Sequence, residues 1–316
     1  MLDAQLLESQ ADIVVRVRKQ LMACEFEVLL VGRDAGYLRD AGEEALGIAE
    51  ELERQLSVFL TDSEVSYINA MAPRQAVRVD PRLYELLRRS ARLTRATHGA
   101  FDISLGRVIK AWNAAARSRR MPTDKEIECA RRSAGAHLIQ FNDEDCTVCF
   151  LAEGVEINLG GIGKGYAVDE MAALLKERGI PSGLITAGTS TVYAFGRPPG
   201  SKGWTVGIRG RRQFSQPVAI VSLVDQALST SGGYEQYFEL EGRQLSHVLD
   251  PRTGYPADGL VSASAIQKSA TDSDALATAF FVLGAEGTAE YCRRHPDTQA
   301  ILVIRGQGET LNVMHC

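Results

Sequence analysis

The sequence predicts an α+β fold with mixed, largely antiparallel sheets packed against helices. Patterns with apolar residues three and four positions apart fill much of the first half, whereas the second half alternates short apolar runs with helical segments. Turns rich in glycine and proline separate many of these runs, and no regular strand–helix–strand repeat is present. At 316 residues, 45% of them hydrophobic, the chain is long enough for one large domain or two smaller ones.

The charge balance and the N-terminal segment exclude several classes of partner. The net charge is −5, so we expect no basic surface that would bind nucleic acid. No apolar run reaches 18 residues, and we expect no transmembrane segment. Residues 1–20 carry acids and lack the basic start, apolar centre and small-residue cleavage site of a secretory signal. We therefore expect an amphipathic helix there and a cytoplasmic protein.

The first half of the chain predicts one strand followed by helices. The apolar run 26–32 is a strand candidate that ends at a glycine. Helical periodicity predicts two long helices, 37–59 and 81–97. The stretch 117–134 is polar and basic, and we expect a further helix within it and a solvated face. A shorter helix follows Asp62 or Ser63, either of which can cap it with Glu64 in the first turn. The sequence Pro-Thr-Asp at 122–124 marks the start of the last helix.

The second half predicts strands and helices in alternation. Apolar runs predict strands near 146–159, 183–195, 203–209, 217–223, 262–267 and 299–304. Periodicity predicts helices at 163–179, 272–283 and 286–295. The composition predicts a loop at 196–203 and a polar glycine turn at 229–238.

Cys146 and Cys149 form an isolated CxxC motif inside one of these apolar runs. A zinc site usually needs a second cysteine pair or nearby histidines, and none is close in sequence. We therefore expect both cysteines on one strand or hairpin.

The segment EINLGGIGKGYAVDEM (156–171) leads from an apolar stretch through four glycines and a lysine into a helical pattern. Glycine allows a ligand to approach the backbone, and the N–H groups of a helix start together with Lys164 favour an anion. The spacing fits neither GxGxxG nor the P-loop, which needs Ser or Thr where Gly165 stands. Two interpretations remain open, a phosphate cradle and a tight turn between a strand and a helix.

The segment LSHVLDPRTGYPADG (245–259) concentrates polar side chains. Four of them fall within seven residues: His247, Asp250, Arg252 and Thr253. In a strand over 244–249, His247 shares a face with Leu249, which is the pattern of a hydrogen-bonded core histidine. The polar neighbours favour a functional histidine instead.

The segment ATDSDALATAFFVLG (270–284) opens a predicted helix with Asp272, Ser273 and Asp274, one of which should cap it. Asp274 and Thr278 are four residues apart and share a helix face. A carboxylate and a hydroxyl on one face suit a hard cation such as Mg²⁺. Capping and metal binding both remain open, although a cap does not account for Thr278 in an otherwise apolar helix.

Seven short segments occur in the order and spacing of one known family. They are MAC (22–24), DSEVSYIN (62–69), THGAFDIS (97–104), INLGGIGKGYAVD (157–169), STSGGYEQYF (229–238), LSHVLDPRTGYP (245–256) and DSDALATAFFVLG (272–284). Together they resemble the ApbE family, the FAD:protein FMN transferases, from Met22 to about Leu302. Members split FAD, transfer FMN to a threonine hydroxyl of an acceptor flavoprotein, release AMP and require Mg²⁺.

The resemblance also implies an architecture and a set of site residues. It implies a single ApbE-like domain over 1–316, of T-fold type, in which two interleaved subdomains share an FAD cleft. Metal ligands are implied at the Asp274 carboxylate, the Thr278 hydroxyl and the Gly160 carbonyl. FAD contacts are implied for Met22, Ala100, Phe101, Asp102, Gly161, Lys164 and Thr253. His247 and Asp274 are the implied catalytic residues, with His247 as the base, which suits a group that titrates near neutrality.

The chain departs from the family pattern at two places. Many members have Gly-Gly followed by Asp or Asn where this chain has Thr189, Ser190 and Thr191, and many have Tyr where Phe59 stands. Two alternatives to FMN transfer therefore stay open. One is an FAD pyrophosphatase, in which water replaces the threonine, and the other is a non-catalytic FAD-binding or carrier protein. The acceptor and the oligomeric state are not predicted.

Overall fold

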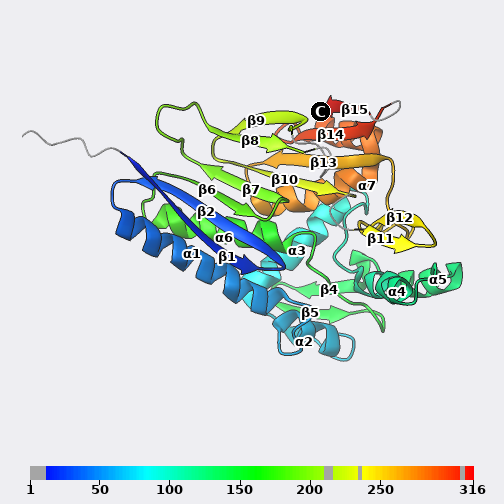
Figure 1. Ribbon diagram of the computed structural model, residues 1–316. Helices are drawn as coiled ribbons and strands as arrows, with labels where there is room; N and C mark the ends of the chain where they lie inside the picture. The colour runs from blue at the N-terminus through cyan, green and yellow to red at the C-terminus, as the bar shows by residue number, and fades with distance from the viewer. Residues whose placement is uncertain (1–11, 210–215, 234–236, 307–309) are drawn as a thin grey trace, which may run out of the picture.

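The centre of the fold is an eight-stranded antiparallel sheet (Figure 1). The computed structural model describes residues 12–209, 216–233, 237–306 and 310–316. From one edge to the other the strands are β1 (Ile13–Leu21), β2 (Cys24–Gly32), β6 (Ser182–Ala187), β7 (Thr191–Phe195), β10 (Gln226–Gly232), β13 (Leu260–Gln267), β14 (Gln299–Arg305) and β15 (Leu311–His315). Every neighbouring pair is antiparallel.

Three helices cover one face of this sheet, as Figure 1 shows. They are α1 (Ala35–Leu56), α6 (Gly163–Glu177) and α7 (Ala270–Arg294), which pack in this order, with α1 over β1 and β2 and α7 over β10 and β13. The opposite face is partly covered by a two-stranded ribbon, β8 (Trp204–Ile208) and β9 (Ala219–Leu223). Leu228 and Ile266 of the central strands pack against this ribbon. The central strands β10 and β13 are therefore covered on both faces, by α7 and by this ribbon.

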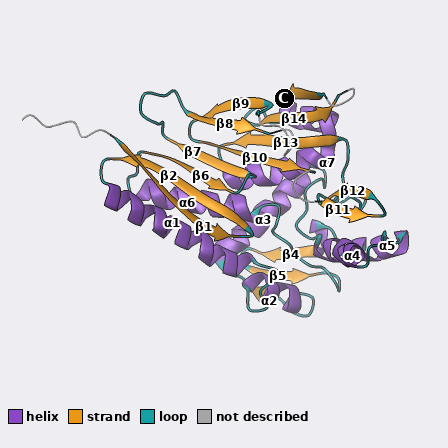
Figure 2. Cartoon of the chain, viewed as in Figure 1, coloured by secondary structure: helices purple, strands orange, loops and turns teal. Residues whose placement is uncertain are grey.

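A second group of elements lies below and to the right of the sheet in Figure 2. Its helices are α2 (Glu64–Met71), α3 (Pro81–Ala96), α4 (Gly106–Arg117), α5 (Asp124–Arg131) and the short 3₁₀ helix η1 (Ala136–Leu138). Its strands are β3 (Val77–Arg78), β4 (Ile139–Asn142), β5 (Thr147–Phe150), β11 (Tyr237–Leu240) and β12 (Arg243–Ser246). One continuous apolar core joins α3 and β5 of this group to α7. The division into two subdomains stays a prediction.

Several helix starts follow the predicted capping chemistry. Ser63 caps α2 by accepting the Ser66 N–H at 3.0 Å, which decides between the two candidate caps. Thr123 and Glu126 form a capping box at α5. Asp80 caps α3 immediately before a proline at the first helical position.

Four predicted elements are wrong in type or extent. The amphipathic helix expected over 1–20 is strand β1 from residue 13 onward, and residues 1–11 lie outside the described part. The long strand 146–159 is only β5, because 151–162 is irregular apart from a bridge between Glu156 and Leu105. The run 183–195 is the hairpin β6–β7. The turn expected at 229–238 is mostly the end of β10 and the start of β11, with 234–236 outside the description.

Other elements escaped prediction or shifted. Helix α4, the 3₁₀ helix η1, strands β3, β4 and β15 and the first part of β10 had no predicted counterpart. The strand expected at 244–249 ends at Ser246. The two helices expected at 272–283 and 286–295 are one element, α7, with a kink at Gly284 (φ 70°).

The cysteine prediction is confirmed, since Cys146 lies in the turn of the β4–β5 hairpin and Cys149 on β5. Over the described ranges, no helix is both long and apolar enough to cross a bilayer.

The turn between β1 and β2 has a strained backbone. Leu21 pairs with Cys24, so only Met22 and Ala23 form the turn, and both have positive φ (49° and 60°). Two-residue hairpins of this type favour Asn-Gly, because a Cβ disfavours the left-handed region. The Met22 N–H donates to Glu53 Oε1 of α1 at 2.8 Å, which fixes the turn against the helix.

We predict that Ala23→Gly stabilises the protein by about 1 kcal/mol, because glycine removes the steric cost of positive φ. The free energy of unfolding from urea denaturation measures the effect. Ala114→Gly, at an exposed position inside α4, is the matched control and should destabilise by about 1 kcal/mol. An equal decrease in the free energy of unfolding in both variants would mean that the turn is not strained.

Candidate functional site

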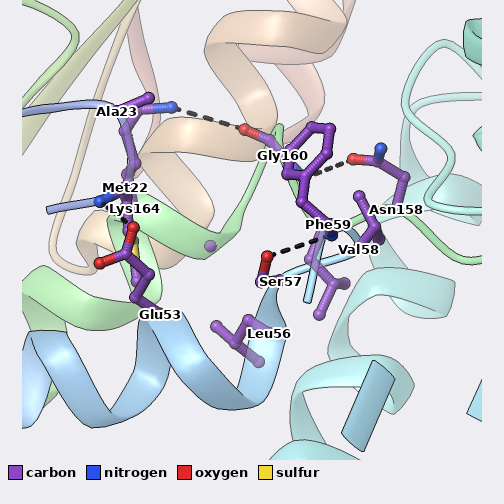
Figure 3. A pocket seen from close by; sticks show the side chains of 12 residues that line it. Met22, Ala23, Glu53, Leu56, Ser57, Val58, Phe59, Asn158, Gly160 and Lys164 are labelled. Atoms are coloured by element: carbon purple, nitrogen blue, oxygen red, sulfur yellow. Dashed lines mark hydrogen bonds between the residues drawn. The ribbon is translucent and has the colours of Figure 1, made fainter. Parts of the chain in front are cut away.

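A pocket of about 210 Å³ opens between the β1–β2 turn, the end of α1 and the glycine loop (Figure 3). Three residues implied by the family resemblance line it together: Met22, Gly160 and Lys164. Lys164 Nζ donates to the Gly160 carbonyl at 3.4 Å, so the positive charge lies over the loop. Phe59 also lines the pocket with a side chain that is 89% exposed. The strained turn and the glycine loop thus form opposite walls of one cavity.

The start of α6 is capped from another helix. Its N-cap residue is Ile162, which offers no side-chain acceptor. The N–H of Gly165, in the first turn, instead donates to Asp274 Oδ2 of α7 at 3.0 Å. An N–H of the first turn and the helix dipole both favour a carboxylate at this place. Asp274 is therefore a cap, as one interpretation held, but for α6 and not for its own helix.

The helix that carries Asp274 is capped differently from the prediction. Ser269 is the N-cap of α7, and its hydroxyl accepts the Asp272 N–H at 3.3 Å. None of the three residues 272–274 caps α7, so that expectation is wrong. Ser273 is buried and donates to the Ala265 carbonyl of β13 at 2.7 Å. Asp274 is left pointing toward α6.

One of the four glycines in the loop, Gly165, is explained by a close contact. A Cβ built on Gly165 would lie 2.2 Å from the Ala270 carbonyl oxygen and 2.8 Å from Asp274 Cβ, so α6 and α7 touch there without room for a side chain. A Cβ on Gly161 would lie 3.4 Å from Phe101 and 3.6 Å from Thr278 Oγ1. The glycine loop, Thr278 and Phe101 are thus brought together.

Hydroxyl groups of the sheet surround Asp274 and Thr278. Thr191 Oγ1 donates to Asp274 Oδ1 at 3.4 Å and accepts from Ser229 Oγ at 3.2 Å. Ser231 Oγ lies 3.2 Å from Thr278 Oγ1. Ser229 and Ser231 are two apart on β10 and so face the same helix layer. The departure at 189–191 therefore places a threonine hydroxyl on the carboxylate.

This hydroxyl set was missed by the sequence analysis. The composition of the run Ser-Thr-Ser at 229–231 and the glycines after it favours a turn, yet its two serines have the period of a strand face. The contact of Thr191 with Asp274 joins residues 83 apart in sequence, and no local pattern announces it.

The residues around Asp274 fit a hard divalent cation. Asp274 is only 5% exposed, and its described partners, the Gly165 N–H and the Thr191 hydroxyl, are neutral. A buried carboxylate without a cation is costly, and carboxylate and hydroxyl oxygens are ligands that Mg²⁺ accepts. Within the described ranges no cluster of three or more His, Cys, Asp or Glu is found. An ion here would rely on one carboxylate and neutral oxygens.

The polar loop after β12 lies against the first half of α7. A Cβ built on Gly233 would be 3.3 Å from Phe281 and 3.6 Å from Ser246 Cβ, so Gly233 lies between this helix and the residue before His247. Arg252 Nη2 reaches the Val282 carbonyl at 3.5 Å. His247 is half-buried and follows the strand directly, so it does not share a strand face with Leu249 as expected.

Asp250 and Arg252 hold the turn that carries Thr253. Arg252 forms two side-chain hydrogen bonds with Asp250, at 2.9 and 2.8 Å, and these raise the pKa of the guanidinium. Thr253 is exposed, and its hydroxyl accepts the Tyr255 N–H at 3.2 Å. Thr253 is thus presented at the surface of a braced turn.

The predicted contacts at 100–102 lie in a tight turn beside the glycine loop. Ala100 and Phe101 are buried, and the Phe101 ring borders Gly161. The Asp102 carboxylate accepts from the N–H and hydroxyl of Ser104, at 2.8 and 2.7 Å, and from the Ala136 N–H at 2.9 Å. In this structure Asp102 therefore braces the turn, and its proposed contact with a nucleotide stays a prediction.

Comparison with known proteins agrees with this arrangement. The sequence model of the ApbE family matches residues 22–302. The chain belongs to the ApbE family. The FAD:protein FMN transferase of Treponema pallidum is 32% identical over 287 residues, covering 86% of this chain and 79% of that protein. The enzyme of the same name from Salmonella typhimurium is 29% identical over 298 residues, covering 91% and 83%.

Solved structures of ApbE proteins share the whole fold. The ApbE protein of Thermotoga maritima superposes with a TM-score of 0.86 at 28% identity, covering 95% of this chain and 96% of that chain. The apo form of the flavinyl transferase ApbE from Pseudomonas stutzeri gives 0.84 at 30% identity, covering 96% and 95%. The predicted family and the α+β fold are confirmed.

We predict that Gly165→Ala forces α6 and α7 apart and destabilises the protein by about 1–3 kcal/mol, the usual cost of overpacking. Gly163→Ala is the matched control, since a Cβ there would lie 3.7 Å from the nearest atom, an ordinary contact. It should change stability by less than about 1 kcal/mol. Urea denaturation compares the two variants, and equal stabilities would contradict the close contact.

Proposed function

We propose that this ApbE-family chain catalyses Mg²⁺-dependent transfer of FMN from FAD to a threonine hydroxyl of an acceptor flavoprotein, with release of AMP. The single observation that carries the proposal is the buried Asp274 carboxylate, held by neutral partners beside Thr278 and the glycine loop. The relatives named above, which carry FAD:protein FMN transferase as their name, supply the reaction class.

The residues of the site divide into proposed metal ligands and groups proposed to bind the diphosphate of FAD. Asp274 and Thr278, with the Gly160 carbonyl, would hold Mg²⁺, which when bound neutralises charge on the diphosphate of FAD. Lys164 adds a positive charge at the pocket beside Gly160. Gly161 leaves the backbone open between Phe101 and Thr278. Met22 and Phe59 supply apolar surface for the ring systems of FAD on the other walls.

His247 is the proposed base. The threonine oxygen forms a bond to the phosphorus of the FMN half, and the bond from that phosphorus to the bridging oxygen breaks, so that AMP leaves. The hydroxyl proton passes to the imidazole of His247, which suits this role at neutral pH. The loop that carries His247 reaches α7 through Arg252, whose Nη2 donates to the Val282 carbonyl, one turn beyond Thr278. Thr253 and Asp102 are further proposed FAD contacts. The cytoplasmic location stays a prediction.

The proposal is tested by incubating the protein with FAD, Mg²⁺ and candidate acceptor flavoproteins, and by measuring FMN addition with mass spectrometry. We predict a covalent FMN adduct with the wild-type protein and a loss of at least about a hundredfold in rate for Asp274→Asn, which removes the charge. The Asn oxygen can still accept the Gly165 N–H, so the melting temperature should fall little.

The products separate the remaining alternatives. Free FMN and AMP without any adduct would identify an FAD pyrophosphatase. Bound FAD that stays intact when Mg²⁺ is added would identify a carrier protein. Full activity of Asp274→Asn would remove the metal assignment.

We predict that His247→Ala lowers the rate of FMN transfer by about a hundred- to ten-thousandfold, the usual range for a general base, while FAD affinity changes less than threefold or so. Flavin fluorescence measures the affinity. An equal loss of rate and affinity would assign His247 to binding. Asp258→Ala, at an exposed position outside the turn, is a control that should leave both quantities unchanged.

A further inference from the structure

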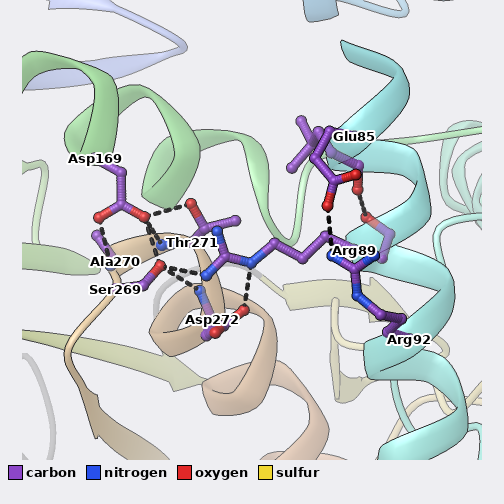
Figure 4. Close-up of polar contacts among 10 residues, drawn as sticks. Glu85, Arg89, Arg92, Asp169, Ser269, Ala270, Thr271 and Asp272 are labelled. Carbon is purple, nitrogen blue, oxygen red and sulfur yellow. Dashed lines mark hydrogen bonds and ion pairs between the residues drawn. The ribbon is translucent and has the colours of Figure 1, made fainter. Parts of the chain in front are cut away.

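Asp169 holds the first turn of α7 from the neighbouring helix α6 (Figure 4). Its Oδ1 accepts the Ala270 N–H at 2.7 Å, and its Oδ2 accepts the Thr271 N–H at 2.9 Å. The hydroxyls of Ser269 and Thr271 also donate to Oδ2, at 2.6 and 2.5 Å. One carboxylate thus receives four hydrogen bonds from three consecutive residues, all at the start of the helix that carries Asp274.

Arg89 of α3 holds the same turn from the other side. Its Nε donates to Asp272 Oδ1 at 2.7 Å and its Nη2 to Ser269 Oγ at 2.7 Å. Burial lowers the pKa of this guanidinium, but the hydrogen bond and charge of Asp272, with smaller contributions from Asp169 and Glu85, outweigh burial and raise it. Arg89 therefore remains charged and offsets the acids at this helix start.

The two helices cap one another. Gly165 and Asp169 are four residues apart on α6, and Ala270 and Asp274 are four apart on α7, so each pair lies on one helix face. Asp274 accepts an N–H from the first turn of α6, and Asp169 accepts two from the first turn of α7. Gly165 lets the helices touch between these contacts. The position of Asp274 therefore depends on how α7 is held at its start.

We propose that Asp169 and Arg89 are positioning residues for the metal-holding side chains, fixing where α7 begins and hence where Asp274 and Thr278 face the glycine loop. This inference rests on the proposed function. Residues behind metal ligands commonly change metal affinity tenfold or more when altered. Neither residue lines the pocket at Lys164, so FAD binding depends on them less.

The test measures Mn²⁺ affinity in the full-length protein, because Mn²⁺ replaces Mg²⁺ and gives an electron paramagnetic resonance signal. Asp169→Asn replaces one carboxylate oxygen by an NH₂ group, which donates and cannot accept. Either the Ala270 N–H or the Thr271 N–H, with the hydroxyls beside it, therefore loses its acceptor. With saturating FAD, we expect the Kd for Mn²⁺ to rise about tenfold at a temperature well below unfolding. FAD affinity, from flavin fluorescence, should change less than twofold or so.

Matched controls are available one residue away on each helix. Glu170→Gln removes a carboxylate next to Asp169 whose ion partner is Arg82, at 3.8 Å. Arg88→Met removes a guanidinium next to Arg89 that pairs with Asp143 at 3.1 Å. Neither control residue has a described contact with the first turn of α7, so both variants should keep the wild-type Kd for Mn²⁺.

Variants of Arg89 provide a second test of the proposal, which holds even if Asp169→Asn does not fold. Arg89→Met should raise the Kd for Mn²⁺ several-fold, and Arg89→Lys, which keeps the charge and one donor, should recover part of that loss. A role in stability alone would lower the melting temperature and leave the Kd of the folded protein unchanged.

The outcomes distinguish the inference from the proposed function. Wild-type affinity in folded Asp169→Asn and in Arg89→Met would overturn the inference alone, provided that the wild-type protein binds Mn²⁺. Equal losses in the two controls would also overturn it, because the effect would then not depend on the first turn of α7. A wild-type protein that binds no Mn²⁺ with FAD present would overturn the metal assignment and the inference together.

Discussion

The exchange of caps between α6 and α7 is the interaction on which the candidate site depends. A helix start leaves N–H groups without intrahelical acceptors, and in a buried helix pair those groups need partners from elsewhere. Here each helix supplies a carboxylate to the other, Asp274 in one direction and Asp169 in the other. Caps of this kind contribute about 0.5–2 kcal/mol each. The same contacts that stabilise the helix pair also place a buried carboxylate beside the glycine loop.

This constraint explains the glycines better than a phosphate cradle alone. Gly165 is required because the Ala270 carbonyl occupies the space of its Cβ, whereas Gly163 has room for one. Gly160 borders the pocket and Gly161 lies beside Thr278, so the loop leaves open backbone there. The tight turn accounts for Gly165, and the phosphate cradle stays a prediction for Gly160 and Gly161. The open backbone at Gly160 and Gly161 and the tight helix contact at Gly165 thus lie within six consecutive residues.

Local signals predicted part of this structure well. Caps at Ser63 and Thr123 use side chains three residues from their donors, so the sequence contains all the chemistry involved. The family segments similarly located Asp274, Thr278 and the glycine loop, which the fold does bring together. Prediction failed where burial overrides periodicity. Strand β10 is polar because Ser229 and Ser231 find hydroxyl partners on other elements, and without those partners the run resembles a turn.

The sequence by itself determined the family, the mixed α+β character and the candidate pair Asp274 and Thr278 on α7, because these depend on residue type and order along the chain. Only the tertiary structure decided which donors each carboxylate serves. Asp274 caps a helix 109 residues away from its own position, and Asp169 caps one about a hundred residues ahead. A hydrogen bond extends only about 3 Å, so its partners are chosen by packing and not by distance in sequence.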